Sequence, residues 1–199
     1  MLAMGGCTAI QSLDAASRQL DTYELSSVSP VTSAAGVRGG PTLFVATPVS
    51  SGAIASDRIV VKPDPFQVTF LPDARWVDPA GVHLQLLLTR SLSGLTRYGL
   101  VTASSSAPFP DFTLMTDVED FQVELASNDQ EPTIRVVVRV QAALVQESNG
   151  RVVARRTFQA IVAAADTRAS GIVPAFDAAT ASVQRELVTW LSTITPIAS

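Results

Sequence analysis

Cysteine, histidine and charge are all scarce in this sequence. Its 199 residues include a single cysteine, Cys7, a single histidine, His83, and only 16% charged residues. One cysteine cannot form an internal disulfide, and one histidine without cysteine or histidine neighbours does not build the usual zinc site. The formal net charge of −4 and the lack of clustered basic and aromatic residues disfavour nucleic-acid binding. We therefore expect no metal, no other cofactor and no nucleic-acid partner.

The motifs of common enzymes are lacking as well. The chain has no GxSxG, no HExxH and no glycine-rich phosphate loop of the Walker type. A lone histidine such as His83 needs a positioned partner to act as a general base, and a surface or partly buried role is the commoner one. In the acidic cluster, strand alternation sends Asp117 and Glu119 to one face and Asp120 to the other, so we expect solvated charges at a sheet edge and no metal site. These absences predict that the protein is not an enzyme.

Apolar residues, in contrast, are plentiful. They make up 47% of the chain, and the mean hydropathy is +0.29. No run of about 18 apolar residues occurs, so the sequence predicts no membrane-spanning helix. A chain of this length buries one core and is expected to form one domain. The excess of apolar over charged side chains favours contact with a partner.

The first residues resemble the lipobox of bacterial lipoproteins. Gly5 and Gly6 directly precede Cys7, and the processing enzyme needs small residues there before the thiol receives a diacylglyceryl group. Met4 stands where leucine is usual, and the alternative is an ordinary unpaired thiol in a frayed terminus. The resulting division of the chain has three parts: a signal or lipobox remnant at 1–7, a flexible tether at 8–21 and the folded domain at 22–195.

Most of the folded domain is predicted to be β-strand. Apolar runs that alternate or are β-branched occur at 22–25, 42–47, 58–62, 66–71, 111–125, 133–146 and 151–162. The last three form an antiparallel meander, in which Asn149-Gly150 supplies the positive φ angles of a tight hairpin. At 66–71, Phe66, Val68 and Phe70 alternate with polar residues, which predicts one buried and one exposed face.

Two helices are expected. The first runs from 79 to about 97, with Asp78 as its N-cap and Pro79 at its first position. Its apolar stripe consists of Val82, Leu86, Leu87, Leu92 and Leu95. The second ends near Ile194, and its stripe consists of Val173, Phe176, Ala179, Val183, Leu187 and Trp190 or Leu191. The predicted fold class is α+β: a single domain with a mixed, largely antiparallel β-sheet and two main helices packed on one face.

Between the predicted strands and the first helix lies Trp76, in a connecting segment. An aromatic residue in such a place either folds back onto the sheet or faces a partner, and we expect the core position because large aromatics are mostly buried.

The sequence around Trp76 resembles the ABC-type transport auxiliary lipoprotein family, which includes PqiC. The pattern is carried by residues 57–63 (DRIVVKP) and 66–78 (FQVTFLPDARWVD), and later by 120–121 (DF), 150–158 and 175–179 (AFDAA). The resemblance extends from about residue 23 to residue 191. It implies that Arg58, Arg75 and Trp76 belong to a family motif with a structural or partner-contact role; no ligand-binding residue follows from it.

The resemblance also implies a function. Members serve as non-catalytic periplasmic accessory subunits of ABC/MCE-type intermembrane lipid transport systems, anchored to the outer membrane of Gram-negative bacteria, here through acylated Cys7. The implied partners are an MCE-domain protein and the inner-membrane ABC permease and ATPase of the same system, and a homo-oligomer is expected. The chain would dock at the outer membrane or complete the conduit.

Two alternatives come from other functional classes. One is a soluble periplasmic lipid-binding carrier, which would need a deep apolar cavity between sheet and helices. The other is a hydrolase that uses His83 with a serine that the sequence does not identify.

Overall fold

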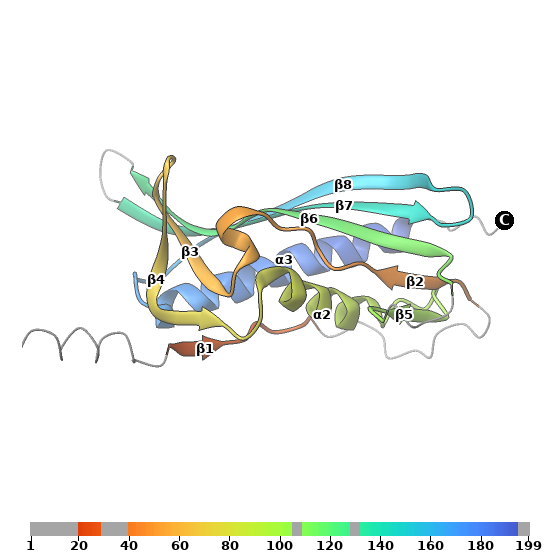
Figure 1. The fold of residues 1–199 in the computed structure, drawn as a ribbon, viewed down its shortest axis with the longest axis horizontal. Coiled ribbons are helices and arrows are strands. Elements are labelled where there is room, and N and C mark those ends of the chain that lie inside the picture. Colours follow the sequence, from red (N-terminus) through yellow and green to blue (C-terminus); the bar gives the residue numbers. More distant parts are fainter. Residues whose placement is uncertain (1–19, 29–39, 105–108, 128–131, 195–199) are drawn as a thin grey trace, which may run out of the picture.

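The computed structural model describes residues 20–28, 40–104, 109–127 and 132–194 (Figure 1). Its elements in chain order are β1 (Asp21–Tyr23), β2 (Thr42–Val45), the 3-10 helix η1 (Gly52–Ala55), β3 (Arg58–Asp64), β4 (Gln67–Trp76), α2 (Ala80–Leu92), β5 (Leu100–Thr102), β6 (Phe112–Ser127), β7 (Pro132–Gln146), β8 (Arg151–Ala163) and α3 (Ala169–Thr193). All these strands belong to one sheet, and both α-helices lie on the same side of it. The predicted α+β class is confirmed. Neither α-helix of the described residues is long and apolar enough to cross a membrane.

The sheet is built around β6. Along one side β6 pairs antiparallel with β7 over its whole length, and β7 pairs in the same way with β8. Along the other side two parallel strands share its length: β2 pairs with Leu114 and its neighbours, and β3 with Gln122 and its neighbours. β5 extends the sheet beyond β2, and β4 followed by β1 extends it beyond β3. The long pairs are antiparallel and the short ones mostly parallel, as a mixed, largely antiparallel sheet requires.

The meander follows the sequence prediction closely. Its second hairpin turns at Gly150, whose φ of +68° lies in the region that favours glycine. The side chain of Asn149 accepts a hydrogen bond from the backbone N–H of Arg151 at 2.9 Å and so stabilises the turn. On β7, Val136, Val138 and Val140 are buried against the helices, and the opposite face is amphipathic, with Val137 between Arg135 and Arg139.

Helix α3 buries its predicted stripe except for Val173, which is partly buried, whereas α2 buries only part of its own. In α3 the buried side chains include Phe176, Ala179, Val183, Leu187, Trp190 and Leu191. In α2 they include Leu84, Leu87, Leu88 and Leu92, while Val82 and Leu86 are exposed by 46% and 40%. The predicted stripe is confirmed at Leu87 and Leu92, which are fully buried, and wrong at Val82 and Leu86. Because 84–88 is almost continuously apolar, its periodicity does not specify which side packs against α3.

The predicted cap of α2 is also wrong. Pro79, with φ −51° and ψ 141°, is the N-cap, and no side chain caps the helix. The backbone N–H of His83 donates to the carbonyl of Pro79 at 3.0 Å. The helix therefore begins one residue later than the sequence suggested, and Asp78 stands outside it.

The β3–β4 hairpin departs most from expectation. Phe66, Val68 and Phe70 were expected on a buried face, but they are exposed by 98%, 50% and 38%. β3 pairs with β6 only through Val60–Lys62, and β1 reaches only the last three residues of β4. A register shift between Val61 and Asp64 accompanies the departure of the hairpin from the sheet, and Figure 1 shows its turn standing clear of the other strands.

Candidate functional site

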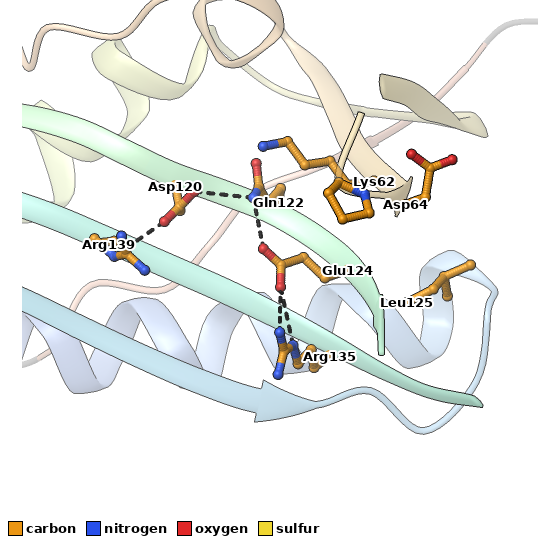
Figure 2. Close-up of a pocket in the computed structure, with 9 residues that line it drawn as sticks. Lys62, Asp64, Asp120, Gln122, Glu124, Leu125, Arg135 and Arg139 are labelled. Atoms are coloured by element: carbon orange, nitrogen blue, oxygen red, sulfur yellow. Dashed lines mark hydrogen bonds and ion pairs between the residues drawn. The ribbon is translucent and has the colours of Figure 1, made fainter. Parts of the chain in front are cut away.

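The face of the sheet opposite the helices carries a polar cleft of about 360 Å³ (Figure 2). Three strands and one turn form it, and the lining residues are Lys62, Asp64, Pro65, Asp120, Gln122, Glu124, Leu125, Arg135 and Arg139. Its floor is formed by alternate residues of β6, which are Asp120, Gln122 and Glu124. Because β6 is flanked by β3 on one side and β7 on the other, residues far apart in the sequence meet there.

Strand register explains why the charges in the cleft pair. Glu124 lies directly opposite Arg135 of β7 and beside Lys62 of β3, and Asp120 lies opposite Arg139. Directly opposed residues of opposite charge stabilise a sheet. Both Nε and Nη2 of Arg135 donate to Oε2 of Glu124, at 3.1 and 2.8 Å, and Nε of Arg139 lies 3.2 Å from Oδ2 of Asp120.

The Glu124 carboxyl is held in its ionised form. Partial burial acts to raise its pKa, but hydrogen bonds from Gln122 and Arg135 and the positive charges of Arg135 and Lys62 outweigh burial. The net result is a pKa below the ordinary value. A carboxylate stabilised in this way is a poor proton donor at neutral pH.

Gln122 joins the two ion pairs at the floor of the cleft. It is only 2% exposed. Its Nε2 donates to Asp120 at 3.1 Å and to Glu124 at 2.9 Å, whereas its Oε1 has no hydrogen-bond partner in the described part of the chain. Within those same residues the ammonium group of Lys62 forms no ion pair within 4.0 Å. The cleft thus offers one cation, Lys62, to a polar partner, whereas the buried Oε1 of Gln122 is closed off from solvent.

The expected picture of the acidic cluster requires correction. A bulge between Val118 and Asp120 shifts the alternation by one residue, so Asp117 and Asp120 point to the same face, opposite Gln141 and Arg139. β6 is a central strand, and Asp120 is ion-paired, so its charge is not a solvated edge charge. In the described ranges no group of three or more histidine, cysteine or acidic residues is placed to hold a metal ion.

The three motif residues of the sequence analysis lie near one corner of the sheet. Trp76 ends β4 and is 1% exposed; its ring contacts Phe176 and Phe121 at centroid distances of 5.1 and 5.6 Å. The expected core position of Trp76 is confirmed. Arg75 donates to Asp57 and Thr22 on the surface, and the guanidinium carbon of Arg58 lies 5.2 Å from the ring centre of Phe70. Cys7 lies outside the described residues.

His83 is a structural residue in this arrangement. It is 4% exposed, and its Nε2 accepts a hydrogen bond from the backbone N–H of Leu25 at 3.1 Å. Its ring meets Trp76 edge to face at 6.3 Å. Burial, partly offset by the charges of Glu24 and Asp78, lowers the pKa of the imidazole. With Nε2 engaged and Nδ1 buried, this histidine is badly placed for general base catalysis.

Comparison with known proteins agrees with these observations. The profile of the family described as ABC-type transport auxiliary lipoprotein component matches residues 23–188. The chain belongs to this family. The match begins in β1 and ends inside α3, so it includes the cleft, the corner and the β3–β4 hairpin. No curated protein matches the chain.

Solved structures share the fold of this auxiliary component. Protein XCC0632 from Xanthomonas campestris is 27% identical, with a TM-score of 0.74, over 87% of this chain and 96% of its own. An uncharacterised protein is 18% identical, with a TM-score of 0.65, over 87% and 99%. The hypothetical protein CT253 from Chlamydia trachomatis, 10% identical, reaches a TM-score of 0.50 over 78% and 97%. The last two show the fold alone.

The space between the helices and the sheet bears on the carrier alternative. One cavity there, lined by Leu84, Leu88, Val138, Val183 and their neighbours, has a volume of only about 10 Å³. Binding sites for small molecules usually measure about 300–1,000 Å³. An acyl chain has no room at this position unless α2 and α3 separate from the sheet.

Proposed function

We propose that this auxiliary component is a non-catalytic subunit of an ABC/MCE-type intermembrane lipid transport system. In this proposal an acylated Cys7 anchors it in the periplasm to the outer membrane, where it docks the system or completes its conduit. The supporting observation is the family match over residues 23–188, which takes in nearly all of the described fold.

The non-catalytic part of the proposal is supported by the burial and pairing of the histidine and of two carboxylates. His83 is buried and engaged with the backbone of Leu25. The carboxylates of Asp120 and Glu124 are neutralised by arginines of the neighbouring strand. Groups whose protons and lone pairs are already committed serve stability and recognition better than proton transfer.

Partner binding is supported by the exposed apolar side chains. The open face of the sheet carries Val49, Met115, Val152 and Ile161, each more than half exposed. Exposed apolar groups of this kind favour association. The partners in the proposal are an MCE-domain protein and the permease and ATPase of the inner membrane, with further copies of the chain as a homo-oligomer.

Co-purification tests the proposed partnership. The full native gene, with a C-terminal tag and its neighbouring transport genes, is expressed in a Gram-negative host, and the membranes are extracted with mild detergent. The MCE-domain subunit is expected to elute with the tagged chain. Elution of the tagged chain without transport subunits, at detergent concentrations that leave the permease and ATPase together, would contradict the proposal.

Intact mass tests the anchor separately. The chain from the native gene is expected to be cleaved before Cys7 and to carry added acyl groups, whereas a Cys7→Ala variant carries none. An unmodified mass for both proteins would remove the anchor from the proposal and leave the partner question to co-purification.

A further inference from the structure

The turn of the β3–β4 hairpin gathers exposed apolar side chains that the proposed function does not use. We call residues 64–70 the hairpin tip. Phe66 is 98% exposed at its apex, and Val68 and Phe70 follow at alternate positions of β4, half and over one third exposed. Alternate residues of a strand point to the same side. The tip therefore presents an apolar edge at Phe66, Val68 and Phe70, while its residues Asp64 and Pro65 line the polar cleft. Figure 1 shows the turn projecting away from the layer of the sheet.

The backbone of the tip has few free hydrogen-bond donors. Pro63 and Pro65 have no N–H, and Oδ1 of Asp64 accepts hydrogen bonds from the N–H groups of Phe66 and Gln67 at 2.8 and 2.9 Å. A protein partner or water can pair with backbone amides, but the acyl region of a bilayer cannot. The internal pairing lowers the cost of moving this turn out of water into lipid.

The spacing of the apolar side chains fits shallow insertion into a bilayer. At about 3.3 Å per residue, Val68 lies about 7 Å and Phe70 about 13 Å behind Phe66. Interfacial protein segments bury their apolar side about 5–10 Å into the boundary between headgroups and acyl chains. Phe66 and Val68 would be immersed to that depth, and the guanidinium group of Arg58, which lies over Phe70, would stay at the level of the headgroups.

The point at which the described chain begins is compatible with a membrane at the tip. β1 pairs with the end of β4 through Asp21 and Ala74, eight residues, or about 26 Å, from Phe66 along the strand. Cys7 and Leu20 are 13 residues apart, and such a segment can span at most about 45 Å. An acyl group on Cys7 can therefore enter the same leaflet that the tip contacts.

From these observations we propose that the hairpin tip inserts Phe66 and Val68 into the surface of a lipid bilayer, as a membrane contact separate from Cys7. It rests on the proposed function only for the position of the anchor. Lys62 and Asp64 carry opposite charges beside the turn, so the insertion is driven by apolar burial and does not require anionic lipid. Anchor and tip together hold the domain at two points and fix its orientation to the membrane.

Flotation with phosphatidylcholine vesicles tests this proposal. The full chain is prepared with Cys7→Ala, so that no acyl group contributes to binding, and is compared with the same chain carrying Phe66→Ser. The matched control is Phe109→Ser, since Phe109 is 100% exposed and lies near the start of β6, at the other end of that strand from the hairpin. We expect Phe66→Ser to weaken vesicle binding about tenfold, which corresponds to about 1.4 kcal/mol, and Phe109→Ser to leave it unchanged.

Fluorescence provides a second readout. Trp76 and Trp190 are buried, so an added Phe66→Trp reports on the tip, and its emission should shift to the blue when vesicles are added, while that of Phe109→Trp should not. Absence of vesicle binding by the Cys7→Ala chain, or equal binding by Phe66→Ser, would overturn the proposal. A Phe66→Ser chain that loses the MCE subunit in co-purification but floats like its parent would instead assign the tip to a protein partner. The acylation test does not affect any of these outcomes.

Discussion

His83 is the only imidazole in the chain, so one substitution can isolate its effect on stability. In the native state it is buried, and burial lowers its pKa from the ordinary value of 6.5. Protonation would remove the lone pair that accepts from Leu25 and would place a charge in the core beside Trp76. The native state therefore binds the proton less readily than the unfolded chain does.

The sign and the limit of the effect follow from proton linkage. Because the native pKa is depressed, the stabilisation is complete above about pH 6.5 and is lost as the pH falls from there towards the native pKa. Carboxyl groups titrate mainly below pH 5, so His83 dominates the window above that. Between pH 7.5 and 5.5 the free energy of unfolding should decrease by at most about 1.4 kcal/mol.

His83→Gln should abolish this dependence while keeping an acceptor near the position of Nε2. Urea unfolding of parent and variant, followed by tryptophan fluorescence at pH 7.5, 6.5 and 5.5, measures the difference directly. The variant should be less stable at pH 7.5, because the ring packing is lost, but nearly constant in stability down to pH 5.5. Equal losses in the two proteins over this range would refute the assignment of His83 as a neutral, buried acceptor.

Three further substitutions test the packing, the turn and the cleft. Trp76→Ala should destabilise the fold by about 3–5 kcal/mol, since the indole is buried among Phe121, Phe176 and His83; a thermal midpoint unchanged within error would contradict the core position. Gly150→Val should cost about 1–2 kcal/mol, because φ of +68° is strained for a branched residue, and denaturant midpoints measure the cost. Glu124→Gln should remove about 1 kcal/mol at pH 7 through the loss of its pairing with Arg135. Because the native pKa of Glu124 is depressed, this contribution is present above the ordinary carboxyl range and disappears as the pH falls through the native pKa, so parent and variant should converge in acid. A gap that does not narrow as the pH falls would point to packing.

The sequence predicted best the elements whose pattern is long and whose ends carry turn residues. In β7 and β8 the side chains alternate between the two faces over more than ten residues each, and the strands are joined at Gly150. The alternation and the turn residue therefore predict the same hairpin. The C-terminal helix has an apolar stripe of several turns that includes Phe176 and Leu187. A single buried face of the helix accounts for the positions of these side chains. Trp76 was placed in the core by its size alone.

The hairpin tip and the cleft could not be predicted in the same way. Alternation at Phe66, Val68 and Phe70 shows which side chains share a face, but it does not show whether another layer covers that face. The two prolines around Asp64 were a signal that this turn leaves the sheet, since neither can donate to a neighbouring strand. The cleft depends on pairing between β3 and β6 and on a single bulged residue near Asp120, which local periodicity does not reveal.

The segment that leads from β1 into the domain has a mechanical consequence. Tyr23 pairs with Trp76 in parallel register, the N–H of Leu25 is held by His83, that of Ser26 by Asp177, and that of Val28 by Gln184. A pull on the chain at Leu20, directed along β1, would load these bonds together in shear instead of opening them one after another. If the chain is anchored to a membrane through Cys7, a force on the anchor is transmitted to β4, α2 and α3 at the same time. The domain can then resist this force without unfolding stepwise from its attachment point.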